Sequence, residues 1–247
     1  PFFLYFGTND VHVPRFPHPR FRGKTDMGHR GDAIVQFDWS VGEVVRALKE
    51  AGIFERTLII LSSDNGPVVD DGYADEAVAR LKNHKPWGPF RGGKYSTFEA
   101  GTRVPFIVHW PERVKAATSP ALVSQIDMTA TLARLVGAKN IADIPADSRD
   151  QLPAWLGKDL KGREYVIGAG SSLTVLTPEW KYIEPSQASP YNVLTNTELG
   201  NHPEEQLYHI VTDRGEYDNI AKEKPEIVGE MKTILEKEKS KGVGMEL

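Results

Sequence analysis

Asp64 and Asn65 directly follow a short apolar run, Leu58 to Leu61, that indicates a buried strand. Ligands of open α/β sheets bind at the carboxyl ends of strands, so these two residues are candidates for a site. Their carboxylate and amide oxygens suit a hard cation such as Ca²⁺ or Mg²⁺ better than zinc. The alternative is that Asp-Asn-Gly-Pro is only a turn that ends the strand.

His12 is a second candidate, because the segment Thr8 to Pro14 follows another apolar run, Phe2 to Phe6. If both runs are strands of one sheet, His12 emerges at the same edge as Asp64. Imidazole groups titrate near neutral pH, so a histidine there can protonate a leaving alkoxide. A surface histidine, or one that is only hydrogen-bonded, is the alternative.

Glycines and basic side chains are combined in residues 89–105, ahead of a further apolar run. Glycines let the backbone approach a ligand closely, and Arg91 and Lys94 beside them suit an oxyanion such as sulfate or phosphate. The spacing is not that of a phosphate-binding P-loop. Glu99 and Arg103 can form a structural ion pair as readily as they can contact a substrate.

The elements that must position these residues follow from the apolar pattern. Three short runs rich in aromatic or branched side chains predict buried strands, at residues 2–6, 57–61 and 105–110. Apolar residues from Ile34 to Leu48 recur every three or four positions, which predicts a helix that ends at Gly52. The strand-helix-strand order favours a parallel sheet. A second helix is expected over residues 125–136.

The pattern changes after about residue 140. Short runs at residues 165–167, 172–176 and 180–183 predict a small antiparallel sheet, and residues 186–205 are polar and loop-like. Pro225 to Lys241 predicts an amphipathic helix with Ile227, Met231, Ile234 and Leu235 inward. The expected fold is α/β, with a mixed, largely parallel sheet flanked by helices in residues 1–140. A subdomain with the antiparallel sheet and terminal helix follows in residues 141–247.

Composition narrows the classes of partner. The chain has 247 residues, 40% of them hydrophobic, a formal net charge of −4 and no cysteine, which is typical of a folded globular protein. No basic stripe indicates nucleic acid, and no apolar run reaches the length of a membrane span. A small solute is the expected partner, and the sequence carries no signal of oligomeric state.

Taken together and in order, these segments resemble the sulfatase family, a branch of the alkaline-phosphatase superfamily. The family shows a strand followed by His-X-Pro, a strand ending in Ser-Asp-Asn-Gly, an Arg-Gly-Gly-Lys segment that leads into Glu-Gly-Gly-X-Arg-Val-Pro, and later Trp-Pro, Leu-Tyr-Asp-Leu and Asn-Leu-Ala signatures. Their counterparts here are Val11 to Pro14, Ser63 to Gly66, Arg91 to Lys94, Glu99 to Pro105, Trp110-Pro111, Glu205 to Ile210 and Glu216 to Ala221. One departure is Ala100, where the family usually has glycine.

The resemblance implies roles for several residues. Asp64 and Asn65 would ligate Ca²⁺ or, alternatively, Mg²⁺. Lys94 would bind the sulfate and reach the leaving oxygen, and His12 would act as general acid or contact the leaving group. Arg91 is a further candidate for substrate binding. His84 is another, because residues 70–87 lie between the metal strand and Lys94 and could form a pocket wall; the alternative is a solvated loop and short helix. The expected substrate is a sulfate ester of a carbohydrate or an aryl sulfate, and the expected compartment is the periplasm or the extracellular space.

In that family the nucleophile is a formylglycine, made from Cys or Ser within Cys/Ser-X-Pro/Ala-X-Arg. This chain has no cysteine and no serine in that pattern, and it begins at Pro1 with an apolar run. We therefore expect the C-terminal portion of a sulfatase, with the formylglycine and further metal carboxylates upstream. Such a fragment is expected to hold metal weakly and to be inactive.

Two other functions fit the same residues. One is a metal-dependent phosphodiesterase or phosphomutase of the same superfamily, which would carry a plain Ser or Thr nucleophile upstream. The other is a glycan-binding domain derived from a sulfatase that never had a nucleophile. The residues before Pro1 would distinguish these from an amputated sulfatase.

Overall fold

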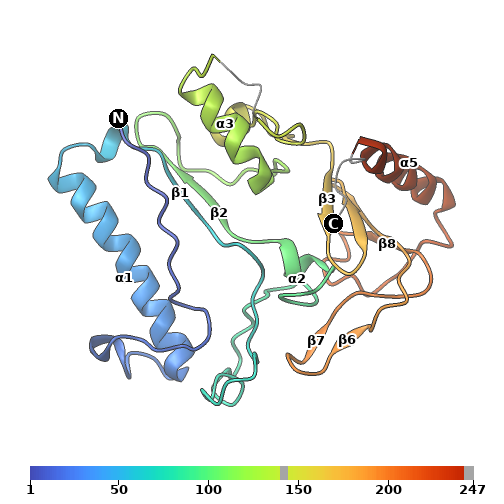
Figure 1. Cartoon of the computed structure of the whole chain (residues 1–247), viewed down its shortest axis with the longest axis horizontal. Helices are drawn as coiled ribbons and strands as arrows, with labels where there is room; N and C mark the ends of the chain where they lie inside the picture. The colour runs from blue at the N-terminus through green and yellow to red at the C-terminus, as the bar shows by residue number, and fades with distance from the viewer. Residues whose placement is uncertain (140–143, 242–247) are drawn as a thin grey trace.

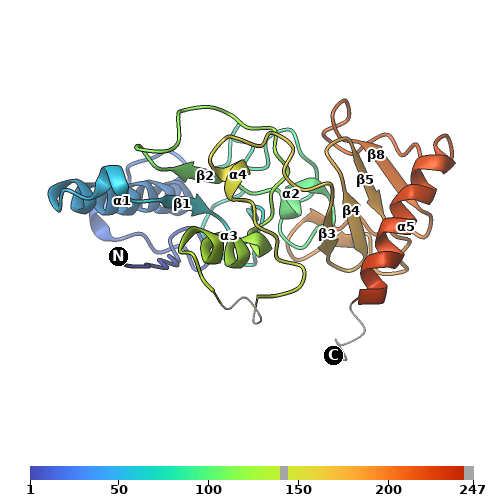
Figure 2. The same ribbon diagram turned by 90° about the horizontal axis from the view of Figure 1, so that it is seen from above.

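The computed structural model describes residues 1–139 and 144–241. Its first part contains a long helix, a strand pair and three short helices, which are α1 (Gly28–Glu50), β1 (Ile59–Ser62), α2 (Glu99–Thr102), β2 (Phe106–His109), α3 (Met128–Leu135) and α4 (Leu152–Trp155). Its second part contains β3 (Val166–Ala169), β4 (Leu173–Leu176), β5 (Trp180–Ile183), β6 (Tyr191–Asn192), β7 (Thr197–Glu198), β8 (Gln206–His209) and α5 (Pro225–Lys241). Helices α1 and α5 lie at opposite ends of the molecule, with β1 and β2 between them (Figures 1 and 2).

Helix α1 forms as predicted. It continues through the apolar positions to Glu50, and Gly52 follows it with a positive φ of 68°, the conformation that lets a chain leave a helix. A 3₁₀ turn, Pro19–Phe21, packs beside it, and another, Phe54–Arg56, leads into β1.

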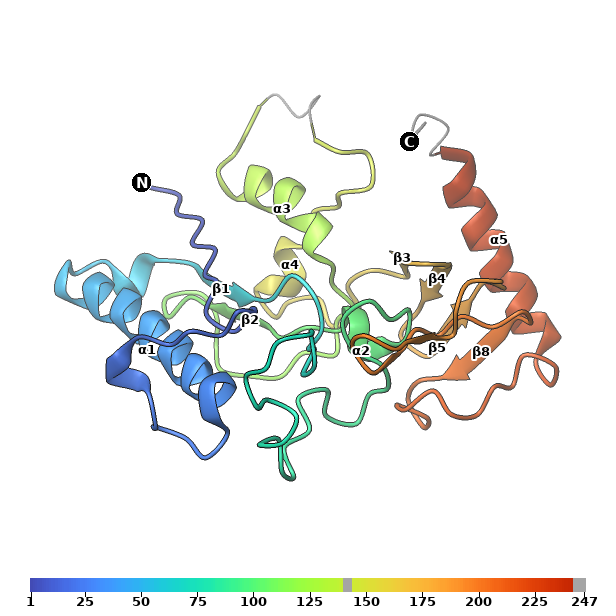
Figure 3. The ribbon, with the colours of Figure 1, turned by 60° about the horizontal axis from the view of Figure 1, so that its bottom comes forward.

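The predicted strand over residues 2–6 is wrong. This segment carries no strand assignment, and its side chains are exposed, 61% for Phe2 and 85% for Tyr5. In Figure 3 it runs from the N-terminus as a ribbon without an arrow. A strand needs a neighbour to accept and donate its backbone hydrogen bonds, and no segment among the described residues pairs with this one.

The predicted largely parallel sheet is likewise not confirmed. Within the described residues, β1 pairs only with β2, and the pair is antiparallel, with Ile59 opposite His109 and Ser62 opposite Phe106. The two strands themselves lie where the apolar runs predicted them. The coarser expectation of a mixed α/β chain is confirmed.

The predicted antiparallel sheet is present. Its strands follow the order β3-β4-β5-β8, and every neighbouring pair is antiparallel. Strand β8 and the hairpin β6-β7 were not predicted, since they lie in or beside a polar stretch. Helix α5 has the predicted bounds and buries Met231 and Leu235, with Ile227 and Ile234 half-buried against the same core.

The sheet is buried on both sides, because side chains alternate along each strand. Val175, Tyr182 and Leu207 pack toward α5 in the larger core. Ile183 and Tyr208 form a second cluster with Phe98, which lies immediately before α2. The C-terminal sheet is thus packed against the segment that carries Lys94. The division at residue 140 stays a prediction.

The helix predicted over residues 125–136 divides into a 3₁₀ turn, Gln125–Asp127, and the shorter helix α3, and its most buried side chains are polar rather than the apolar ones that the sequence pattern favours. Ile126 just ahead of α3 is 45% exposed, whereas Asp127 and Thr131 are fully buried. Asp127 holds the guanidinium of Arg163 through both carboxylate oxygens, and Thr131 receives the backbone N–H of Gln151. The polar contacts of Asp127 and Thr131 with Arg163 and Gln151 therefore determine which face of α3 is buried. None of the helices in the described ranges is long and apolar enough to cross a membrane.

Candidate active site

Asp64 and Asn65 lie in the turn that follows β1, as predicted. Asp64 is exposed, and its Oδ1 accepts the backbone N–H of Asn65 at 2.9 Å. The Asn65 side-chain amide nitrogen donates to the carbonyl of Gly66 at 2.8 Å. Gln125 fixes the end of the strand by donating to the Ser62 hydroxyl at 2.9 Å.

Two close backbone approaches join this turn to the glycine-rich segment. Gly66 donates its N–H to the carbonyl of Gly101 at 2.9 Å, and a Cβ on Gly66 would lie only 1.7 Å from the carbonyl oxygen of Ala100. Lys94 donates its N–H to the carbonyl of Pro67 at 2.9 Å. These two segments picked out by the sequence therefore do meet, and the glycine at position 66 is required by contact rather than by its φ angle.

His12 and Lys94 are the two predicted site residues in direct side-chain contact. Lys94 Nζ lies 3.1 Å from His12 Nε2, and His12 Nδ1 lies 2.7 Å from the carbonyl oxygen of Val13. Because an ammonium has no lone pair, Nε2 must accept this bond, and Nδ1–H then donates to the carbonyl. The arrangement thus holds a proton on Lys94 next to a histidine lone pair.

Arg91 has structural partners. Its guanidinium forms a bidentate pair with Glu198 on β7, at 2.6 and 3.1 Å, and donates to the carbonyl of Glu216 at 2.8 Å. It also stacks over the Phe98 ring at 4.3 Å. These contacts tie the glycine-rich segment to the β6-β7 hairpin, and the predicted role of Arg91 in substrate binding stays a prediction.

Glu99 and Arg103 form the ion pair that was the structural alternative for them. Glu99 is buried and also contacts Lys181 Nζ at 2.9 Å, and its backbone N–H donates to Glu216 at 2.6 Å. Burial raises the pKa of the Glu216 carboxyl to about 7, against the opposing effect of Lys181. The sequence reasoning missed Lys181 and Glu216. The one available signal for Lys181 was its position within the apolar run of β5, because a buried charge needs an oppositely charged partner.

Residues 68–84, between β1 and β2, form a segment that is held in place by Arg15 and is called the wall segment below. Arg15 is buried and donates to the carbonyls of Val68 and Val69 and to Asp75 Oδ2, the last at 2.6 Å. His84 is exposed, and its backbone N–H donates to the carbonyl of Leu81. No side-chain contact joins His84 to Lys94 among the described residues, so its predicted role stays a prediction.

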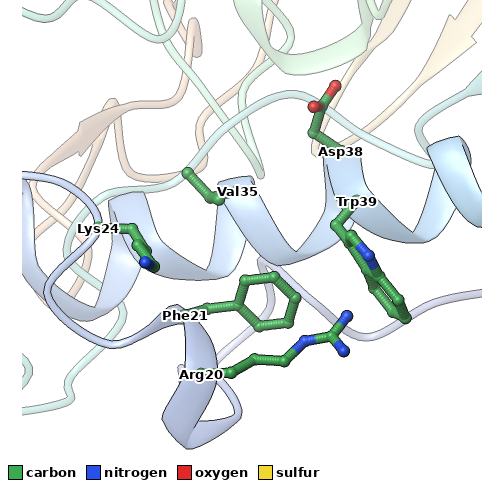
Figure 4. A pocket seen from close by; sticks show the side chains of 6 residues that line it. All are labelled: Arg20, Phe21, Lys24, Val35, Asp38 and Trp39. Atoms are coloured by element: carbon green, nitrogen blue, oxygen red, sulfur yellow. The ribbon is translucent and has the colours of Figure 1, made fainter.

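A surface hollow of about 440 Å³ lies elsewhere, between the Pro19–Phe21 turn and α1 (Figure 4). The Arg20 guanidinium lies 3.6 Å from the centroid of the Trp39 ring, so this cation already has an aromatic partner. None of the predicted site residues lines this hollow, whose walls are Arg20, Phe21, Lys24, Val35, Asp38 and Trp39.

The donors present fit part of a calcium shell. Asp64 and Asn65 offer hard oxygen atoms at an exposed turn, whereas Ca²⁺ takes six to eight oxygens. Over residues 1–139 and 144–241 no group of three or more acidic, histidine or cysteine side chains is placed to hold a metal. These two residues could supply only a minority of the ligands.

Comparison with known protein families assigns most of the segments described above to one family. The family model described as Sulfatase matches residues 1–138, more than half of the chain. This chain belongs to the sulfatase family. The resemblance read from the motifs is thereby confirmed.

Relatives of this sulfatase-family chain include an N-acetylgalactosamine-6-O-sulfatase from Bacteroides thetaiotaomicron, 49% identical over 243 residues that cover 98% of this chain and 48% of that protein. Human arylsulfatase A is 28% identical over 252 residues, covering 95% of this chain and 48% of that protein. The chain therefore spans about half the length of these relatives.

Solved structures agree with this assignment. A Bacteroides thetaiotaomicron sulfatase structure from a study of glycosaminoglycan metabolism superposes with a TM-score of 0.94 at 49% identity, covering 97% of this chain and 50% of that one. The PsFucS1 sulfatase from Pseudoalteromonas superposes with a TM-score of 0.77 at 25% identity, over 93% of this chain and 46% of that one. The sulfatase family thus accounts for the fold of both parts of the chain.

Proposed function

We propose that the whole protein to which this chain belongs hydrolyses a sulfate ester on an amino sugar of a glycan. The observation that carries the proposal is the 3.1 Å contact between Lys94 Nζ and His12 Nε2, next to the turn that bears Asp64. A cation beside a proton-accepting nitrogen suits a reaction in which an anionic group is held while an oxygen leaves. The 49% identity to an N-acetylgalactosamine-6-O-sulfatase supports a 6-sulfated N-acetylhexosamine as substrate.

In the proposed reaction, Lys94 neutralises an oxygen of the sulfate group through its ammonium. The oxygen that leaves carries negative charge as the ester bond breaks, and it needs a proton. Lys94 donates a proton to this oxygen as its bond to sulfur breaks, and the lone pair of His12 Nε2 orients the ammonium through their hydrogen bond. The Val13 carbonyl accepts a hydrogen bond from Nδ1–H and so fixes the tautomer that keeps this lone pair on Nε2.

Asp64 and Asn65 would hold part of a Ca²⁺ site, with Mg²⁺ as the alternative cation. When bound, the cation would neutralise sulfate oxygens and polarise the sulfur. The family resemblance implies that the nucleophile is a formylglycine, and this chain contains neither cysteine nor a serine in the required pattern. We therefore infer that residues 1–247 alone do not turn over substrate. The same resemblance supports a periplasmic or extracellular location.

The test is sulfate release from N-acetylgalactosamine 6-sulfate by the whole protein, compared with its Lys94→Ala variant. Loss of one preorganised charge at a reacting group lowers kcat/KM by about 10²–10³-fold. Lys237→Ala is the matched control, since Lys237 is an exposed lysine on α5 and should leave the rate unchanged. Hydrolysis of the diester bis(4-nitrophenyl) phosphate faster than of any sulfate ester would favour the phosphodiesterase alternative instead.

A further inference from the structure

Tyr95 occupies an unusual backbone conformation immediately after Lys94. The N–H of Ser96 donates to the carbonyl of Gly93 at 2.9 Å, which closes a four-residue turn with Tyr95 at its third position. Tyr95 has a φ of 79°, in the left-handed region that L side chains rarely adopt and that favours glycine at this position of a turn. A large aromatic residue therefore stands where the backbone favours glycine.

Packing does not explain this choice. Tyr95 is 47% exposed, and the ring has no place in either buried cluster of the described residues. Its hydroxyl donates to Asp71 Oδ1 at a long 3.3 Å, and exposed bonds of this kind contribute little to stability. A strained backbone conformation at a residue that is not buried, as at Tyr95, is typical of ligand sites.

The ring faces the reacting groups. Lys94 Nζ lies 5.4 Å from the centroid of the Tyr95 ring and 3.1 Å from His12 Nε2, so the ammonium is close to both aromatic side chains. Asp71 is half-buried on the wall segment and uses one oxygen for Tyr95. Among the described residues no other hydrogen bond to its carboxylate is found, so Oδ2 can accept one from a ligand.

We propose that Tyr95 and Asp71 form the sugar-binding subsite beside Lys94. The Tyr95 ring stacks on the apolar face of the sugar that bears the sulfate, and Asp71 accepts a hydrogen bond from a hydroxyl or N–H group of that sugar. The negative charge of Asp71 disfavours a second sulfate or a carboxylate at that place. The subsite thus selects a sugar with one sulfate. This inference rests on the proposed function and deepens it.

The Tyr95→Gly variant of the whole protein tests the stacking role. Glycine suits the φ of 79°, so thermal stability should be unchanged or higher, while kcat/KM for N-acetylgalactosamine 6-sulfate falls by about tenfold or more. Inorganic sulfate has no sugar to place in this subsite, so its inhibition constant should stay within about twofold. Lys82→Gly is the control, because Lys82 is another exposed residue with a positive φ, 52°, and its variant should keep full activity.

The Asp71→Asn variant tests the charge selection. Asparagine keeps an oxygen for the Tyr95 hydroxyl but removes the negative charge, so the preference for N-acetylgalactosamine 6-sulfate over the 4,6-disulfate should fall by about tenfold. Asp38→Asn, an exposed carboxylate on α1, should leave the preference unchanged. If the unaltered protein hydrolyses the substrate and the Tyr95→Gly and Asp71→Asn variants have the same rates and substrate preference, this inference is overturned and the proposed function stands. If the unaltered protein releases no sulfate from any ester, the proposed function fails and the inference fails with it.

Discussion

The Lys181 ammonium lies 2.9 Å from Glu99 Oε1, and both side chains are almost completely buried. Lys181 belongs to β5 of the C-terminal sheet, and Glu99 begins α2, directly after the segment that carries Lys94. Arg103 pairs with the second oxygen of Glu99, and Glu216 lies 3.6 Å from the Lys181 ammonium. This buried network connects the C-terminal sheet to the candidate active site.

Removing the buried cation should destabilise the protein strongly. In a Lys181→Met variant, Glu99 and Glu216 lose their shared buried partner, and such losses cost about 3–5 kcal/mol of unfolding free energy. Urea unfolding measures the change. Lys232→Met is the control, because Lys232 forms an exposed pair with Glu205 that should be worth less than about 1 kcal/mol. Equal losses in both variants would contradict a structural role for the buried network.

Stability should fall as the pH rises from about 5 to 8. Burial raises the pKa of Glu216 to about 7 from an ordinary value of 4.5, so between these values the folded state binds more protons than the unfolded state. The contribution of Glu216 to the free energy of unfolding is fully present below the unfolded pKa and is lost as the pH passes through 7. This loss amounts to about 3 kcal/mol at most. Thermal unfolding from pH 5 to 8.5 should show this slope.

The Glu216→Gln variant should lose most of that slope. Glutamine stays neutral at every pH in the range and can still accept the N–H of Glu99 through its amide oxygen. Glu99 contributes in the opposite sense: although burial raises its pKa, the charges of Lys181 and Arg103 bring it below the ordinary value, so its contribution is lost only in acid. A slope unchanged in the variant would assign the pH dependence to another group.

Gly66→Ala should break the junction between the turn that bears Asp64 and the glycine-rich segment. The new Cβ would lie 1.7 Å from the carbonyl oxygen of Ala100, a backbone atom that cannot move alone, and overpacking of this kind costs about 1–3 kcal/mol or more. Gly42→Ala is the matched control, since Gly42 lies within α1 with open space around it, and alanine there should stabilise by about 0.5–1 kcal/mol. Urea unfolding distinguishes the two signs.

Local signals explain which parts of the fold were predictable. The bounds of α5 and β5 were correct because apolar periodicity, a proline at the first turn and a turn between strands act over a few residues. Residues 2–6 carry an equally strong apolar signal, yet they form no strand. A strand also requires a partner, and composition alone does not supply one.

The candidate site was predictable where motifs mark it and not where it depends on distant contacts. Asp64, Lys94 and His12 were found from their order along the chain. Lys181 was missed because its contact with Glu99 joins positions 82 residues apart, and no pattern within either segment names the other. The orientation of Tyr95 was missed for a related reason, since a positive φ at a tyrosine contradicts its local preference.

Calcium should bind this chain only weakly when residues 1–247 are studied alone. Asp64 and Asn65 provide two side-chain oxygens of the six or more that the ion takes, so isothermal titration should give a dissociation constant above about 1 mM. Asp64→Asn should leave this weak binding nearly unchanged. A micromolar constant that Asp64→Asn abolishes would show that the chain holds a complete site by itself.

Removal of the His12 imidazole should affect poor leaving groups more than good ones. In a His12→Gln variant of the whole protein, Lys94 loses the nitrogen that accepts its hydrogen bond at 3.1 Å and directs its remaining proton toward the leaving oxygen. A sugar alkoxide needs that proton as it leaves, so kcat for N-acetylgalactosamine 6-sulfate should fall by about 10²-fold. The nitrophenolate of 4-nitrophenyl sulfate leaves readily without a proton, and its kcat should fall less than about tenfold. His202→Gln, at an exposed histidine of the C-terminal part, should change neither rate. Equal losses for both substrates would contradict a role of His12 in directing the Lys94 proton to the leaving oxygen.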